Sequence, residues 1–201
     1  MIKNYIFDFG NVLGNFYPDW LTAPFVQDEA LLRTISDVVF DRALWDPLDA
    51  GRITDEALKA EICHKLPEEW GELGCRVYDN WIATLTPVEG MPELIEDMKK
   101  AGMNLYLLSN ISIGFANGHQ NVPWIRDVLT GFCGCVFSGN LGITKPDRKI
   151  FEYLLKTYSL QAEECLFIDD RESNIKGAEV LGINGYLFNG DVTALRQKIG
   201  L

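Results

Sequence analysis

Residues 5–13 read Tyr-Ile-Phe-Asp-Phe-Gly-Asn-Val-Leu, and this stretch decides the fold. An apolar run of β-forming side chains leads to a single carboxylate, Asp8, and a Gly-Asn pair follows shortly after. The pattern predicts a buried strand with Asp8 at its carboxyl end, then a sharp turn. Ligands of parallel α/β sheets bind at that end of the strands. On this stretch alone, an Asp that merely initiates a turn is an equally good explanation.

Beyond Gly90 the sequence alternates between short apolar runs and amphipathic segments. The runs predict strands at 105–108, 135–137, 165–168 and 186–188. Helices are expected at about 92–101, 122–129, 147–158, 173–181 and 192–199. Such alternation implies parallel strands joined by right-handed crossovers. We therefore predict an α/β fold, a Rossmann-like parallel sheet with helices on both faces.

Residues 14–17 look like a connector, and residues from about 23 to 88 carry helical patterns and no convincing strand. Thr54 is an N-cap candidate for a helix that ends near residue 65, and Pro67 opens another helix. A helical insert of this size behind one strand indicates an all-helical cap, although helices that simply cover one face of the sheet would give the same pattern. We expect a discontinuous core domain, residues 1–14 and 88–201, and a cap domain, residues 15–87.

The charge balance and the cysteine pattern indicate which binding partners and which cellular compartment to expect for this protein. Lys and Arg number 18 against 29 Asp and Glu, a net charge of -11, so we expect no nucleic acid and no membrane partner. No run approaches the roughly 20 apolar residues of a membrane span, and no signal-peptide core is visible. The five cysteines have no Cys-x-x-Cys spacing and are predicted to be reduced thiols in or near the core. These features together predict a cytoplasmic protein.

Polar side chains stand where the predicted strands end. They are Asp8 after the first strand, Ser109 and Asn110 after the second, Asp169 and Asp170 after the fourth, and Lys145 in the loop beyond the third. In a parallel sheet they share one edge, where three carboxylates are costly without a cation. Carboxylate oxygens with no His or Cys nearby suit Mg²⁺. Mg²⁺ with a Lys and Ser or Asn donors is what a phosphoryl group requires.

Four segments resemble the motifs of the haloacid dehalogenase superfamily. They are residues 7–13 (FDFGNVL), 108–110 (LSN), 144–147 (TKPD) and 167–170 (FIDD). Their order and separation fit, and the resemblance covers essentially the whole chain. The helical insert matches the helical-bundle (C1-type) cap of one subfamily, and residues 51–56 (GRITDE) resemble that cap's recurring turn. The first motif is closest in form to bacterial α-D-glucose-1-phosphate phosphatase-like proteins.

The resemblance implies a hydrolase, specifically a Mg²⁺-dependent phosphatase of a small phosphorylated metabolite such as a sugar phosphate. Asp8 would attack phosphorus, form an aspartyl-phosphate and also bind Mg²⁺. The backbone carbonyl of Gly10 and the carboxylate of Asp170 would be further metal ligands. Asp169 would act through water or as an outer partner.

The resemblance also implies how the phosphate ester is held. Ser109 and the backbone of Asn110 would bind phosphate oxygens, and Lys145 would offset the negative charge of the phosphate and of the nucleophile. The partner is then a small-molecule phosphate ester, and a lid that opens and closes favours a monomer or small homo-oligomer. The tryptophans of the insert would either line a sugar-binding face or pack between helices: Trp20, Trp45, Trp70 and Trp81.

Gly10 departs from the superfamily pattern, which usually has a second Asp there to protonate the leaving oxygen and then activate water. Acid–base help of this kind is typically worth about 10²–10⁴-fold in rate. Asp19, His119 or a metal-held water are candidate substitutes, and the sequence does not choose among them.

Because Gly10 lacks the acid, two alternative functions remain. One is a metal-independent dehalogenase, against which the Asp169-Asp170 pair argues; the other is a catalytically weakened binding or regulatory protein.

Overall fold

The centre of the molecule is a five-stranded parallel sheet. A computed structural model describes all residues, 1–201. The strand order is β5-β4-β1-β6-β7, and every neighbouring pair is parallel. The strands span β1 (Asn4–Phe7), β4 (Asn104–Ser109), β5 (Gly134–Phe137), β6 (Cys165–Asp169) and β7 (Asn184–Leu187). The predicted strands are confirmed, with ends that shift by one or two residues.

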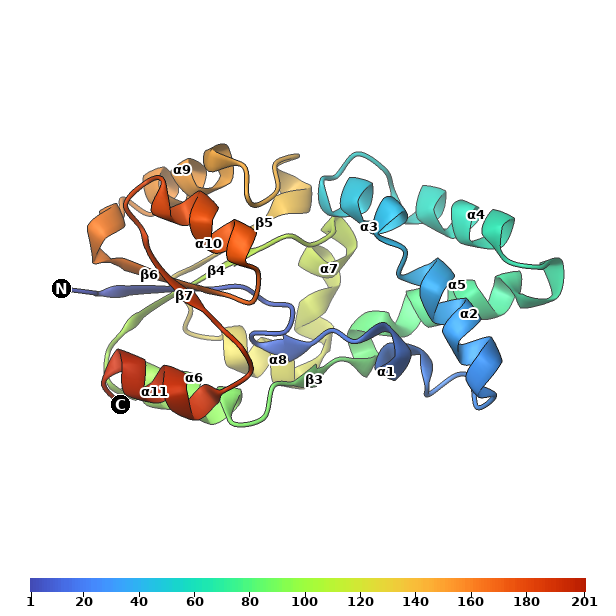
Figure 1. The fold of residues 1–201 in the computed structure, drawn as a ribbon, viewed down its shortest axis with the longest axis horizontal. Coiled ribbons are helices and arrows are strands. Elements are labelled where there is room, and N and C mark those ends of the chain that lie inside the picture. The colour runs from blue at the N-terminus through green and yellow to red at the C-terminus, as the bar shows by residue number, and fades with distance from the viewer.

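Helices cover both faces of this sheet (Figure 1). One face carries α6 (Met91–Lys100), α8 (Pro123–Leu129) and α11 (Val192–Ile199), and the other carries α9 (Arg148–Thr157) and α10 (Glu172–Glu179). The remaining short elements are α7 (Ile113–Gly118), η1 (His119–Asn121), η2 (Ser138–Asn140) and η3 (Ala162–Glu164). The Rossmann-like α/β fold class is confirmed.

Side chains alternate across the buried strands. In β1, Tyr5 and Phe7 enter the larger apolar core, which packs against α6, α8 and α11 and continues into the cap helices, whereas Ile6 enters the smaller core under α9 and α10. A parallel strand that is buried on both faces reads as an unbroken apolar run. This burial explains why the sequence pattern located β1, β4 and β6.

Five helices, α1 to α5, gather beyond one end of the sheet instead of covering either of its faces (Figure 1). We call them the cap helices; they span α1 (Pro18–Thr22), α2 (Glu29–Val39), α3 (Arg42–Asp49), α4 (Asp55–Lys65) and α5 (Glu68–Thr84). The chain enters and leaves them through an antiparallel pair, β2 (Gly14–Asn15) with β3 (Thr86–Pro87). This pair was not predicted, because no convincing strand pattern marks either segment.

Polar N-cap residues begin two of the expected helices, among them the predicted N-cap Thr54. The Thr54 hydroxyl accepts the backbone N–H of Ala57 at 3.2 Å, and the Asp147 carboxylate accepts that of Lys149 at 2.9 Å. Each bond satisfies a donor that the first turn leaves unpaired. None of the helices combines the length and the apolarity needed to cross a membrane.

Candidate active site

The predicted site residues meet at the carboxyl edge of the sheet. Strand β1 lies between β4 and β6, with Phe7 level with Leu107 on one side and Ile168 on the other. Asp8 therefore emerges beside the ends of both neighbours, where Ser109 closes β4 and Asp169 closes β6. The topology alone brings together segments that are about a hundred residues apart in the sequence.

Three carboxylates form a cluster at this edge. Asp8, Asp169 and Asp170 each offer an oxygen within 4.8 Å of the others. Burial raises the pKa of Asp8 to about 6, with the Lys145 charge opposing and the neighbouring Asp169 adding to the rise. Burial also raises the pKa of Asp170, and Asp169 contributes to that rise. An all-oxygen cluster that is costly to ionise fits a hard divalent cation.

Lys145 is the buried cation that faces this cluster. Its Nζ lies 2.8 Å from Asp8 Oδ1 and 2.8 Å from Asp169 Oδ2, and it donates to the backbone carbonyl of Leu108 at 2.8 Å. These partners match the three donors of an ammonium group. Burial alone would lower the pKa of Lys145, but Asp8 and Asp169 outweigh it and the pKa is raised. Lys145 therefore stays charged beside the proposed nucleophile.

Asp169 uses both of its oxygens within the protein. Besides the Lys145 ammonium, it accepts the backbone N–H of Arg171 at 2.8 Å and the Asn174 amide, which reaches both oxygens at 3.0 Å. These contacts leave Asp169 better suited to orient Lys145 than to bind a ligand directly. Sequence reasoning missed Asn174, because only the docking of α10 onto β6 turns this side chain inward.

Asn110 fixes the loop that carries Lys145. Its amide donates to the backbone carbonyl of Lys145 at 2.9 Å, and its side-chain oxygen accepts the Lys145 N–H at 2.7 Å. The Asn110 side chain is thus committed to this loop, which leaves its backbone free to face a ligand. Ser109 is buried beside it, and both residues line the same pocket.

The turn after Asp8 supplies further polar contacts. Asn11 accepts the N–H of Phe16 at 2.9 Å and donates to Asp170 Oδ2 at 3.4 Å, a role that sequence reasoning did not assign. Gly10 lines the pocket, and a Cβ placed on it would meet only the Cβ of Phe16 at 3.9 Å. A Cβ would therefore fit at position 10, where this chain has glycine.

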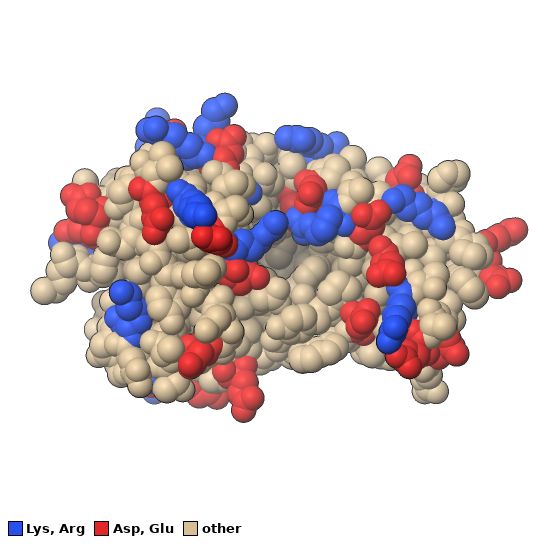
Figure 2. Space-filling model, in the orientation of Figure 1, with Lys and Arg blue, Asp and Glu red and all other residues tan.

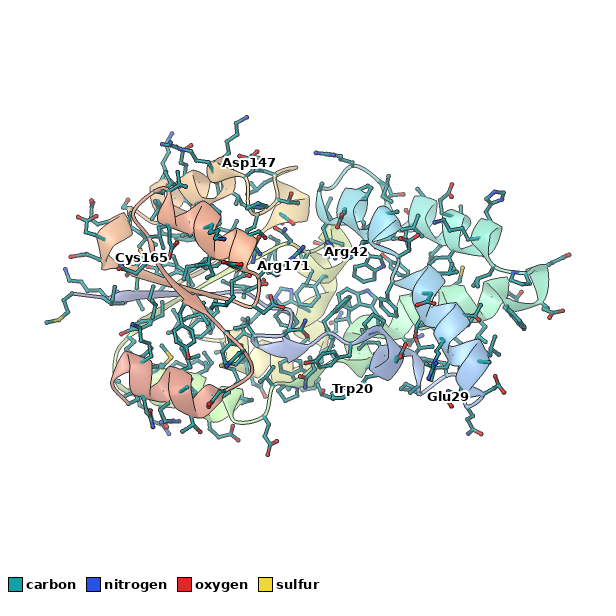
Figure 3. The ribbon with its side chains drawn as sticks, in the orientation of Figure 1. Trp20, Glu29, Arg42, Asp147, Cys165 and Arg171 are labelled. Atoms are coloured by element: carbon teal, nitrogen blue, oxygen red, sulfur yellow. The ribbon has the colours of Figure 1, made fainter.

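A pocket of about 460 Å³ opens above Asp8 between the sheet edge and the cap helices. Phe9 and Ile111 line it from the core, and the rest of its apolar lining is aromatic and comes from the cap side: Phe16, Phe40, Trp45 and Trp81. Figure 2 shows Lys and Arg side chains beside a hollow near the middle of this face. Arg42 of α3 and Arg171 of the loop before α10 both line the pocket and lie on opposite sides of the opening (Figure 3). The arrangement suits an anion joined to a less polar group.

The sequence candidates for a substitute acid do not line this pocket. Asp19 is exposed on α1. His119 is buried, its ring stacks on Phe115, and its Nδ1 lies 3.1 Å and 3.0 Å from the backbone carbonyls of Phe115 and Ala116. Asp49, at the end of α3, does line the pocket. Sequence reasoning missed Asp49, because Pro47 interrupts the helical pattern around it.

The fold and the site define a hydrolase with a carboxylate-rich centre at the edge of a parallel sheet. The family model described as haloacid dehalogenase-like hydrolase matches residues 2–182, and the chain belongs to this family. The predicted membership is confirmed, and with it the expectation of a hydrolase. The finer likeness of the first motif to glucose-1-phosphate phosphatases remains a prediction.

Similar proteins match along nearly the whole chain. A sesquiterpene phosphatase of Aspergillus oryzae is 25% identical over 98% of this chain and 97% of its own length. A D-ribitol-5-phosphate phosphatase of Bacteroides thetaiotaomicron is 26% identical over 92% of this chain and 91% of its own. Among solved structures, a haloacid dehalogenase family enzyme of Bacteroides thetaiotaomicron in complex with magnesium and inorganic phosphate has a TM-score of 0.72 at 23% identity, covering 97% of this chain and 99% of that one.

Proposed function

We propose that the protein is a Mg²⁺-dependent phosphatase that hydrolyses a small phosphorylated metabolite through an aspartyl-phosphate on Asp8. The observation that carries this proposal is the contact between Asp8 and the buried Lys145, 2.8 Å apart, on the wall of a pocket with two further carboxylates beside them. A carboxylate that is kept near a fixed positive charge is ionised when an anionic ester arrives. Two relatives that are named as phosphatases support the same reaction class.

The donor set fits Mg²⁺. Asp8, Asp170 and the backbone carbonyl of Gly10 would hold the ion, and Asp169, whose oxygens already accept from Lys145 and Asn174, would act as an outer partner. When bound, Mg²⁺ would neutralise charge on the phosphoryl group and keep Asp8 ionised. A structural neighbour crystallised with magnesium and inorganic phosphate supports this assignment.

The chain's own residues would carry the first half of the reaction. An oxygen of Asp8 would attack phosphorus while the ester oxygen leaves on the opposite side. Ser109 and the backbone N–H of Asn110 would hold phosphate oxygens, and Lys145 would offset the charge that the transferring group brings. Because Asn110 and Asp169 both fix Lys145, this charge is in place before the substrate binds.

The cap helices would select the substrate. We propose that residues 15–87 form a cap domain that opens and closes over a core domain of residues 1–14 and 88–201. Trp45 and Trp81 are buried in the core of the cap and also line the pocket, where they would contact the C–H groups of a sugar phosphate. The same wall also fits the phosphate ester of an apolar alcohol, and the Aspergillus relative is named a sesquiterpene phosphatase.

Hydrolysis of p-nitrophenyl phosphate by the purified protein, with Mg²⁺ and with a chelator, tests the proposal. We expect turnover that needs Mg²⁺ and that Asp8→Asn abolishes without unfolding the protein. The dehalogenase alternative would be established if the protein releases halide from a 2-haloacid, if the chelator does not affect this release, and if p-nitrophenyl phosphate is not hydrolysed. Phosphate binding with no turnover of either substrate would establish the binding or regulatory alternative. A panel of sugar phosphates and apolar alcohol phosphates then identifies the substrate class.

A further inference from the structure

Asp49 has a buried oxygen that no group in the protein satisfies. It is the last residue of α3 and is 3% exposed. Its Oδ1 is the one buried side-chain polar atom of the chain without a hydrogen-bond partner. An unpaired buried carboxyl oxygen costs free energy, and such groups in native proteins call for a functional explanation.

The backbone of Asp49 is anchored to the core. The Ser138 hydroxyl accepts the backbone N–H of Ile111 at 2.9 Å and donates to the backbone carbonyl of Asp49 at 2.6 Å. This bridge joins the end of α3 to the loop after β4 and to η2. This bridge fixes the position of Asp49, which lines the pocket from the cap side. Asp8 and Lys145 line the same pocket from the core.

Burial, more than the charged groups around it, raises the pKa of Asp49. On α3, Arg42 Nη1 lies 3.8 Å from Asp49 Oδ2, while Asp46 adds a negative charge. From the core, the Asp8 charge raises the pKa of Asp49 and the Lys145 charge lowers it. Burial is the largest effect and raises the pKa of Asp49 to about 8 despite Arg42. Two further arginines, Arg52 and Arg171, line the polar recess of about 320 Å³ beside it.

We propose that Asp49 is the general acid and base of this enzyme, in place of the aspartate that Gly10 lacks. This inference rests on the proposed phosphatase function. In the first step the bond from Asp8 to phosphorus forms, the bond from phosphorus to the ester oxygen breaks, and the Asp49 proton moves to that oxygen to release an alcohol. In the second step the Asp49 carboxylate takes a proton from water, the water oxygen bonds to phosphorus, and the bond from phosphorus to the Asp8 oxygen breaks. Inorganic phosphate leaves, and Asp8 and Asp49 return to their starting states.

Two substrates of nearly equal size but different leaving groups test this role. p-Nitrophenolate is a weak base that departs without a proton, whereas phenolate is more basic and benefits from an acid. For Asp49→Asn we expect kcat/KM for phenyl phosphate to fall by about 10²-fold or more, and that for p-nitrophenyl phosphate to fall far less. Asp19→Asn, an exposed aspartate of the cap outside the pocket, is the control and should leave the ratio of the two values unchanged. An equal loss with both substrates would mean a structural role and would overturn the proposal.

The pH dependence of the unaltered protein gives a test that does not depend on the variant's folding. Above a pH of about 8 Asp49 loses its proton. The ratio of kcat/KM for phenyl phosphate to that for p-nitrophenyl phosphate should then fall, because the ionisation of the two phosphates cancels in the ratio. A ratio that stays constant from about pH 7 to about pH 9 would overturn the proposal. If p-nitrophenyl phosphate is hydrolysed but the ratio does not respond, only this inference fails; if neither ester is hydrolysed, the proposed function fails with it.

Discussion

Lys145 is the residue on which the charge balance of the site depends. It is 4% exposed and lies between Asp8 and Asp169, so two buried carboxylates share one buried ammonium. A buried charge is tolerated only when its partners are in place. The net negative charge that remains in the cluster, with Asp170 added, is the reason to expect that a cation binds there.

Asp170→Ala tests the metal assignment at this scale. Asp170 contacts only Asn11 through its side chain, at 3.4 Å, so its carboxylate is free to bind an ion. We expect the Mg²⁺ concentration for half-maximal activity to rise on the order of 100-fold. Glu172→Gln, an exposed carboxylate two residues away that pairs with Lys176, is the matched control. An unchanged Mg²⁺ titration in Asp170→Ala would remove this residue from the ligand set.

The affinity for Mg²⁺ should depend on pH. In the protein without metal, burial raises the pKa of Asp8 to about 6 and raises that of Asp170. Below about pH 6 the cation must therefore displace protons, and affinity should fall by about tenfold per pH unit for each proton released. Above that range the carboxylates are already ionised, and affinity should level off. Calorimetric titration with Mg²⁺ between about pH 5 and about pH 8 measures this, and a flat profile would contradict the raised pKa values.

At the scale of elements, the end of α3 is tied to the core by close backbone packing. Gly51 has φ +62°, and a Cβ there would lie 2.3 Å from the backbone carbonyl oxygen of Gly139 in η2. The left-handed conformation costs an L-residue roughly 1–2 kcal/mol, and this contact adds a steric clash. The turn therefore depends on glycine for its conformation and for the close approach of the two segments.

Gly51→Ala should destabilise the protein more than Gly102→Ala. Gly102 has φ +71° but open space around its Cβ position. Gly102→Ala should therefore lose only the roughly 1–2 kcal/mol of stability that the left-handed conformation costs an L-residue. Gly51→Ala should cost more and should also lower kcat/KM, because α3 carries Asp49. Urea unfolding and p-nitrophenyl phosphate turnover measure the two effects. Equal stability losses in the two variants would show that the contact with Gly139 is unimportant.

The sequence predicted those elements whose burial leaves a periodic pattern. Strands β1, β4, β5 and β6 are apolar on both faces, and their ends located Asp8, Ser109 and Asp169. The pair β2 and β3 was missed because two-residue strands carry no period. Helix α3 was missed because Pro47 lies inside it. Asn174 and Asp49 reach the site only through tertiary packing, which no local pattern records.

At the scale of the whole molecule, the cap helices place basic and aromatic residues over an acidic centre. The chain has a net charge of -11, yet three arginines line the pocket or the adjoining recess: Arg42, Arg52 and Arg171. Positive charge near the entrance would attract an anionic ester that the rest of the surface repels. The aromatic wall then gives the non-phosphate part of the substrate a place to pack.

The central claim is that the phosphoryl group passes through Asp8. We would quench the protein with acid during turnover of p-nitrophenyl phosphate, reduce the acyl phosphate with borohydride and locate the modified residue by peptide mass spectrometry. Reduction of an aspartyl-phosphate yields homoserine, so the account predicts homoserine at position 8 in the turning-over protein and none in Asp8→Asn. The account would be contradicted if the phosphoryl group were found on another side chain during turnover. It would also be contradicted if Asp8→Asn kept full activity.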